Sequence, residues 1–201
     1  MKNLVLYCVL LVIIISCGGP GNGSVERDGV PSIDHRVFVS SASYDGKFLA
    51  NSGALTGTDA ADKHCADLAK AAGLVRSYKA ILSTSSINAK DKLSFTGAVY
   101  IVKGTQKVKI VEAGLDLWST DSKDLLFSIN IDENETTVAT GTKIWTGTDS
   151  SGTKDTDHCT NWTANSVVSG SYGETDFTNQ KWLYSTTSNC SSQNRLYCIS
   201  Q

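Results

Sequence analysis

The sequence has no run of lysine or arginine residues, and its charges nearly cancel. Eighteen basic side chains stand against 20 acidic ones, which gives a formal net charge of −2 for 201 residues. Proteins that bind nucleic acid or anionic lipid by electrostatic attraction carry a concentrated basic surface. The charge balance therefore argues against this mode of binding, and we expect no nucleic-acid partner.

Sequence signatures of catalysis are also missing. There is no Gly-x-Ser-x-Gly nucleophile elbow, no phosphate-binding loop and no glycine motif for dinucleotides. Histidine is scarce, with only His35, His64 and His158. We interpret His64 and His158 as surface residues beside disulfides rather than as bases. The sequence thus predicts a protein that is not an enzyme, with no catalytic residues and no cofactor.

No apolar run reaches the ~20 residues with which a helix crosses a bilayer. The longest run covers residues 4–15, follows Lys2 and ends just before Ser16 and Cys17. A basic start, a short apolar stretch and a small residue describe a secretory signal. A cysteine directly after such a stretch resembles the lipobox of bacterial lipoproteins. The alternative is an ordinary signal peptide that contains Cys8 and Cys17.

The lipobox interpretation predicts a signal peptide over residues 1–16 and acyl chains on Cys17. These chains would attach the protein to a membrane, since more than one chain is needed for stable anchoring. Residues 17–34 are rich in glycine and lack apolar periodicity, so we expect a flexible tether there. The globular domain is predicted over residues 35–201.

Four cysteines remain once Cys8 and Cys17 are set aside. In an oxidising compartment an even number predicts two disulfides. Three pairings are possible, and the sequence pattern does not choose among them. The four residues are Cys65, Cys159, Cys190 and Cys198.

The apolar pattern predicts an α+β domain with one main helix. The helix begins with Thr58 or Asp59 as its cap, ends at Gly73 and turns Cys65 toward the core. A long polar loop is expected over residues 146–178. Short strands are predicted at residues 36–41, 78–83, 98–102, 107–111, 143–145, 181–184 and 195–199.

Two sets of motifs resemble the frame of endostatin. The later set is Trp145-x-Gly147-x-Asp149-x-x-Gly152, Cys159-x-x-Trp162, Cys190 and Leu196-Tyr197-Cys198-Ile199. The earlier set is Gly57-x-Asp59 to Cys65, Ala72-Gly73-Leu74 and Tyr78-Lys79-Ala80-Ile81-Leu82-Ser83. The chain is similar over residues 36–201 to the leptospiral endostatin-like lipoproteins, with a diverged middle at residues 84–140.

This resemblance implies a C-type-lectin-like fold with nested disulfides, Cys65 with Cys198 and Cys159 with Cys190. It also implies a lipid-anchored adhesin on the outer membrane, exposed at the cell surface. Its partners would be host matrix or plasma proteins such as laminin, fibronectin, complement factor H and plasminogen, with roles in virulence and immune evasion. A carbohydrate-binding lectin and a structural envelope lipoprotein facing the periplasm remain alternatives.

The metal sites of related proteins lack their residues here. Sugar-binding lectins hold calcium with Glu-Pro-Asn or Gln-Pro-Asp and Trp-Asn-Asp motifs, but this chain has no proline after Pro31. Mammalian endostatin holds zinc with several histidines, of which only His35 has a counterpart. We therefore expect no metal, although Asp149, Asp155, Asp157, Glu174 and Asp176 leave an irregular ion site in the late loop as an alternative.

Candidate binding residues come from tryptophan and the late acidic loop. Trp145 and Trp162 lie beside cystine positions of the frame, which favours core packing. Trp118 lies in the diverged middle, and we expect it at the surface as an aromatic anchor. Together with Trp118, the candidate partner-binding residues are Asp149, Asp155 and Asp157.

Overall fold

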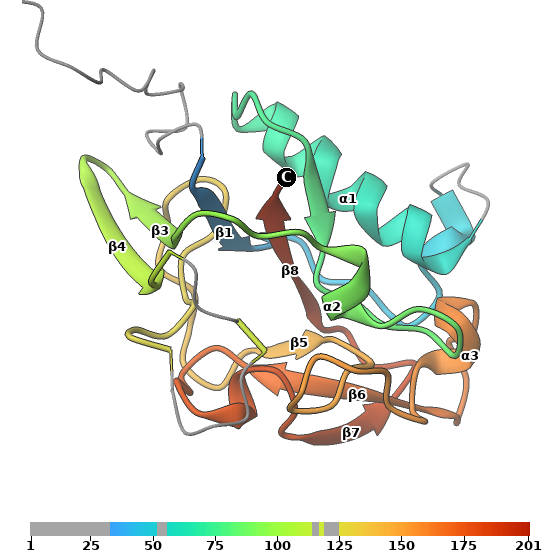
Figure 1. Ribbon diagram of the computed structural model, residues 1–201. Helices are drawn as coiled ribbons and strands as arrows, with labels where there is room; N and C mark the ends of the chain where they lie inside the picture. Colours follow the sequence, from blue (N-terminus) through green and yellow to red (C-terminus); the bar gives the residue numbers. More distant parts are fainter. Residues whose placement is uncertain (1–32, 52–55, 114–116, 119–124) are drawn as a thin grey trace, which may run out of the picture.

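The computed structural model describes residues 33–51, 56–113, 117–118 and 125–201 (Figure 1). The predicted signal peptide, the lipidated Cys17 and the tether up to residue 32 lie outside the described residues, so these expectations stay predictions. Within the described ranges, no helix has both the length and the apolar character needed to cross a membrane.

The backbone forms one mixed β-sheet with one main helix, and the predicted α+β class is confirmed (Figure 1). The strands are β1 (His35–Val39), β2 (Tyr78–Ala80), β3 (Val99–Lys103), β4 (Gln106–Val111), β5 (Lys143–Trp145), β6 (Ser169–Glu174), β7 (Thr186–Asn189) and β8 (Arg195–Ser200). The helices are α1 (Gly57–Ala71), α2 (Ala89–Lys92) and α3 (Cys159–Trp162), with 3-10 turns η1 (Phe48–Asn51) and η2 (Gln180–Trp182).

Strand β8 lies at the centre of the sheet. The order is β4-β3-β1-β8-β5-β6-β7, and β2 also pairs with β8. Strand β1 pairs antiparallel with β8 and parallel with β3, whereas β5 pairs parallel with β8. This arrangement brings the start and the end of the described chain side by side and places β5, β6 and β7 on the far side of β8.

Alternating side chains of β1 and β8 build two cores. Phe38 and Cys198 belong to the cluster that contains the buried residues of α1, whereas Val37 and Ile199 belong to the cluster on the other face. Successive side chains of a strand point to opposite faces of a sheet. Both central strands are therefore apolar at consecutive positions, because both faces are covered.

Helix α1 follows the predicted apolar periodicity, but its cap differs. Thr56 is the N-cap, and its hydroxyl accepts a hydrogen bond from the amide of Asp59. Thr58 and Asp59, the predicted caps, lie in the first turn. The predicted end is confirmed, since Ala72 closes the helix and Gly73 follows with φ of 76°.

Two predicted segments differ from the structure. Residues 181–184 are not a strand. Residues 180–182 form the 3-10 turn η2, which the side chain of Asn179 caps, and the successive residues Trp182 and Leu183 are both buried. The loop predicted at residues 146–178 contains strand β6. Its glycines lie against bulky neighbours: a Cβ on Gly170 would come within 2.6 Å of the Cys159 sulfur. Apolar periodicity does not reveal this strand, because three of its four buried positions are glycine or serine and only Tyr172 is a large apolar residue.

The two disulfides have the pairing that the resemblance implies. Cys65 in α1 is joined to Cys198 in β8, and both are fully buried. Cys159 in α3 is joined to Cys190, which follows β7. The first bond fastens the main helix to the central strand, and the second fastens α3 to the last hairpin of the sheet.

Candidate functional site

Helix α3 is a single left-handed turn. Cys159, Thr160, Asn161 and Trp162 have φ values of 49°, 53°, 57° and 61°. The amide of Trp162 donates to the carbonyl of His158 at 2.9 Å, which closes the turn. Left-handed backbone costs an L-residue about 1–2 kcal/mol, so four consecutive residues persist only where surrounding contacts hold them.

Those contacts come from both ends of the turn. Cys159 is held by its disulfide, and Trp162 is fully buried with its ring stacked on Phe48 at 5.1 Å. The indole N–H of Trp162 donates to the carbonyl of Ser83 at 2.7 Å. The side-chain oxygen of Asn161 accepts from the Ser85 amide at 2.8 Å. The turn is therefore bonded to three separate parts of the chain.

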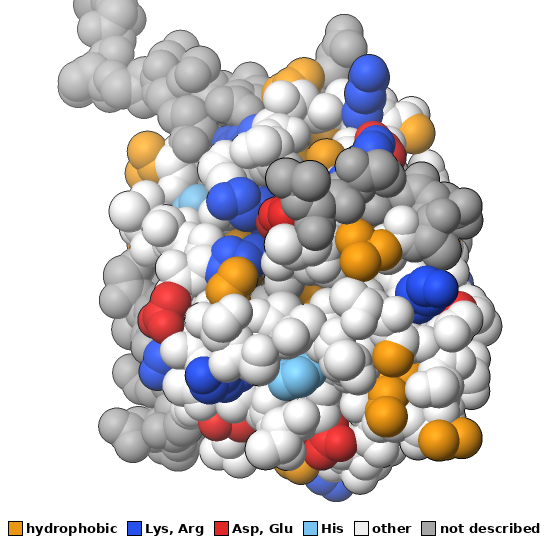
Figure 2. All heavy atoms as spheres, turned by 90° about the vertical axis from the view of Figure 1, so that its right-hand side faces the viewer, with side chains coloured by type: hydrophobic (Ala, Val, Ile, Leu, Met, Phe, Trp, Pro, Cys, Tyr) orange, Lys and Arg blue, Asp and Glu red, His pale blue; other side chains and the backbone are white. Residues whose placement is uncertain are grey.

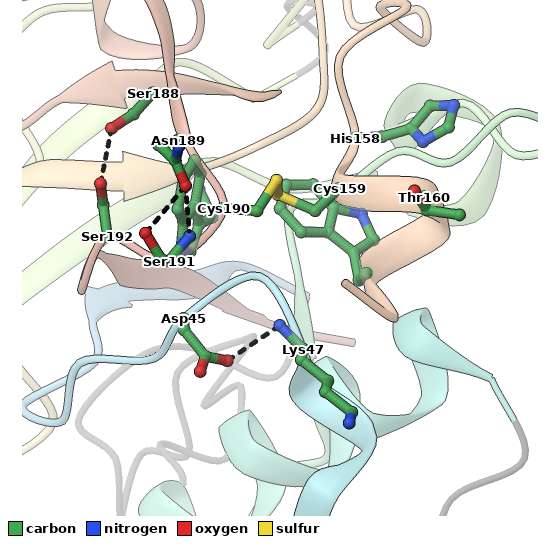
Figure 3. Close-up of a disulfide and its surroundings, with 12 residues drawn as sticks. Asp45, Lys47, His158, Cys159, Thr160, Ser188, Asn189, Cys190, Ser191 and Ser192 are labelled. Carbon is green, nitrogen blue, oxygen red and sulfur yellow. Dashed lines mark hydrogen bonds between the residues drawn. A yellow bond between two sulfur atoms is a disulfide. The ribbon is translucent and has the colours of Figure 1, made fainter. Parts of the chain in front are cut away.

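The same disulfide positions the loop of residues 43–48 (Figure 3). The Gly46 amide donates to the carbonyl of Cys190 at 2.7 Å. A Cβ on Gly46 would lie 2.4 Å from the Cys159 sulfur, so only glycine permits this approach. Asp45 and Lys47 flank this glycine, and the side chain of Lys47 extends away from the Asp45 carboxylate (Figure 3).

A shallow pocket of about 240 Å³ lies between this loop and α1. The ring of Tyr44 stacks on His64 with a centroid distance of 4.3 Å. The pocket is lined by Ser43, Tyr44, Asp45, Lys47, Phe48, His64 and Gln193. We call it the Tyr44 pocket. It combines aromatic rings, the oppositely charged Asp45 and Lys47, and neutral polar groups on a backbone that the disulfide restrains.

Burial shifts the pKa values of the two stacked side chains. It raises the pKa of Tyr44 to about 12, with the negative charges of Glu133 and Asp67 acting in the same direction. Burial also lowers the pKa of His64, against the opposing effect of a hydrogen bond with the backbone of Phe48. At neutral pH both rings are therefore uncharged.

We predict that His64 titrates below the ordinary histidine value of about 6.5. Because the folded state resists protonation of this ring, the contribution of His64 to stability is complete above the unfolded pKa. It is lost progressively as the pH falls toward the folded pKa. Histidine NMR titration measures the midpoint, and Tyr44→Ala, which exposes the ring, should move it back upward. A midpoint at or above 6.5 would contradict this.

The three predicted acidic residues accept hydrogen bonds within the late loop, and their role in partner binding stays a prediction. Asp149 accepts hydrogen bonds from both the amide and the hydroxyl of Ser151 and Thr153. Burial opposes ionisation of Asp149, but these hydrogen bonds outweigh it and lower its pKa. Asp155 accepts from the hydroxyl of Ser171, and the hydroxyl of Thr156 lies 3.5 Å from the Asp155 carboxylate and 3.3 Å from that of Asp157. These hydrogen bonds hold the backbone of the late loop.

No metal cluster emerges from the residues that the structure describes. Among them, no three or more histidine, cysteine, aspartate or glutamate side chains are grouped so that they could hold an ion. The expectation that the protein binds no metal stays a prediction.

The expected exposure of Trp118 is wrong. Its side chain is only 7% exposed and belongs to the core cluster on the face of the sheet opposite α1. It stacks on Trp182 at 6.4 Å and lies against Gly152, where a Cβ would approach the indole to 2.6 Å. Trp145 and Trp162, which were expected in the core, are confirmed there with no exposure.

The residues of the Tyr44 pocket were not singled out from the sequence, apart from His64. Tyr44, Asp45 and Phe48 stand in a glycine-containing stretch without periodicity, and no local pattern links them to α1. On the face that Figure 2 shows, basic, acidic and hydrophobic side chains are scattered among uncharged ones, with no large patch of a single kind.

A family model described as "Protein of unknown function (DUF1554)" matches residues 49–181. The match includes α1, α3 and strands β2 to β6. Tyr44 and Asp45 precede it, and Cys190 and β8 follow it. No curated protein matches the chain.

Proposed function

This chain belongs to the DUF1554 family of proteins of unknown function, and we propose that it is a lipid-anchored binding protein that acts as an adhesin. In this proposal Cys17 carries the anchor in the outer membrane, and a C-type-lectin-like domain is presented at the cell surface. The partners are host matrix or plasma proteins of the class of laminin, fibronectin, complement factor H and plasminogen. No catalysis is part of the proposal.

The observation that carries this proposal is the surface around the Cys159–Cys190 disulfide. Val167 is 87% exposed and Val168 is 41% exposed, although both are apolar. The carbonyl of Val168 accepts from the Cys190 amide at 2.9 Å, so the disulfide restrains the loop that carries them. Exposed apolar side chains on a restrained loop bind with a smaller loss of conformational entropy.

This surface continues to the Tyr44 pocket. The side-chain amide of Asn165 lies 3.3 Å from the Asp45 carboxylate, and Lys47 forms an antiparallel bridge with Thr163. Loops 43–48 and 163–168 are thereby joined into one surface, which we call the disulfide surface. A partner that covers both loops would bury the exposed valines together with the rim of the pocket.

A substitution at the tip of this surface tests the proposal. In the full chain with Cys17→Ser, which removes the anchor, we expect saturable binding to at least one of immobilised laminin, fibronectin, factor H or plasminogen. Val167→Asp places a charge in the contact and should weaken that binding about tenfold, or ~1.4 kcal/mol. Surface plasmon resonance provides the measurement.

Val75→Asp is the matched control, because Val75 is also apolar and exposed (57%) but lies just after α1. Absence of saturable binding to all four proteins, or an equal loss with both variants, would refute the proposal. Protease treatment of intact cells tests the location separately. Complete protection of the domain would favour an envelope protein facing the periplasm.

A further inference from the structure

Strand β7 lies at one edge of the sheet (Figure 1). The strand order ends there, and within the described part of the chain β6 is the only strand that pairs with β7. Thr186, Thr187 and Asn189 are exposed. An edge strand presents unpaired backbone groups with which another strand can pair. The outer side of β7 is therefore open to a further strand.

The hydrogen bonds of β6 show which backbone groups of β7 face outward. Thr187 lies opposite Ser171 in the antiparallel register. The amide of Ser171 donates to the carbonyl of Asp157 at 2.8 Å, and its carbonyl accepts from the amides of residues 146 and 147. Because Ser171 uses both groups on the side away from β7, Ser171 and Thr187 form a pair without mutual hydrogen bonds. The amide and carbonyl of Thr187 thus point to the open side, and neither has a hydrogen-bond partner among the described residues.

The opposite edge of the sheet is protected in a way that β7 is not. Strand β4 carries Lys107 and Lys109, and the carbonyl of Ile110 accepts from the amide of Leu126 at 3.0 Å. Charged side chains and a covering segment are common protections of an edge strand against pairing. The sequence of β7, Thr-Thr-Ser-Asn, has neither charge nor proline. One edge of this sheet is therefore blocked, and the other is available.

The surroundings of β7 also lack charge. Residues 159–173 and 184–194 contain no lysine, arginine, aspartate or glutamate, although 19% of the whole chain is charged. The pairing of β6 with β7 places parts of these two stretches side by side. Two copies of this chain carry the same net negative charge and repel each other. A charge-free edge is where they can approach at the lowest electrostatic cost.

From these observations we propose that β7 pairs antiparallel with β7 of a second copy of this chain, about a two-fold axis at Thr187. Residues of a hydrogen-bonded antiparallel pair exchange both N–H···O bonds. The outward amide and carbonyl of Thr187 would therefore bond to those of the same residue in the second copy. Such a contact is self-complementary, because each copy contributes the same surface. The proposal does not use the disulfide surface and does not depend on the proposed function.

Sedimentation equilibrium of the Cys17→Ser chain tests this inference. We expect a monomer–dimer equilibrium with a dissociation constant below about 1 mM. Thr187→Lys and Thr187→Glu each place two like charges beside each other across the axis, so each should weaken the dimer at least about threefold. An equimolar mixture of the two variants should restore association, because opposite charges then face each other.

Thr105→Lys is the matched control, because Thr105 is also an exposed threonine but lies in the β3–β4 loop. It should not weaken the dimer, and circular dichroism reports the folding of every variant. A chain that stays monomeric at millimolar concentration would overturn the inference and leave the edge of β7 to a strand of another protein. A dimer that both Thr187 variants keep at full strength, or a mixture that does not restore association, would also overturn it.

Discussion

Removal of the Cys65–Cys198 disulfide is expected to lower the free energy of unfolding by about 3–5 kcal/mol. The bond spans 133 residues, which gives a chain-entropy effect of about 5 kcal/mol as an upper figure. The second disulfide lies inside this loop and shortens its free length, which reduces the effect slightly. Cys65→Ala with Cys198→Ala, compared with the parent chain by urea denaturation, measures the difference.

The inner disulfide provides the comparison for this experiment. Cys159–Cys190 spans only 31 residues, so the same arithmetic gives about 4 kcal/mol as an upper figure. Replacing this pair with alanine should therefore cost less stability than replacing the outer pair. If replacing the inner pair lowered the free energy of unfolding more than replacing the outer pair, loop length would not explain the contributions of the two disulfides.

Trp162→Ala is expected to destabilise the fold by about 3–5 kcal/mol, because a fully buried tryptophan leaves a large cavity. The variant also loses the stacking on Phe48 and the hydrogen bond to the Ser83 carbonyl. Both contacts hold the left-handed turn of α3, so the disulfide surface should loosen as well. Urea denaturation gives the stability, and hydrogen exchange of residues 159–168 reports the turn.

Val167→Ala is the control for this second prediction. Its side chain is 87% exposed, and surface substitutions of this kind usually change stability by less than about 0.5 kcal/mol. A loss below about 1 kcal/mol for Trp162→Ala would mean that the turn is held by the disulfide alone.

Local patterns predicted the main helix well and its cap less well. The apolar periodicity that ends at Gly73 marks the buried face of one helix. Residues on this face are only three or four positions apart, so the pattern can be read from the sequence. Thr56, Thr58 and Asp59 all have side chains that cap helices, so the sequence offers several starting points. Only the backbone conformation shows that Thr56 has the extended geometry of the cap.

The missed elements have a common cause. Strand β6 has glycine at position 170 because Trp145 and the Cys159 sulfur occupy the space that a larger side chain would need. Trp118 is buried because Trp182 and Gly152 form its site. Each depends on a partner distant in the sequence, and apolar periodicity describes only near neighbours.

Composition and the pattern of near neighbours were sufficient to predict the charge balance, the α+β class and the position of α1. These properties depend on composition or on residues a few positions apart. The left-handed turn of α3, the stacking of Tyr44 on His64 and the burial of Glu133 beside Ser41 are visible only in the folded chain. These features arise where loops from distant parts of the chain meet at the Cys159–Cys190 disulfide, and their energies come from contacts that no local pattern encodes.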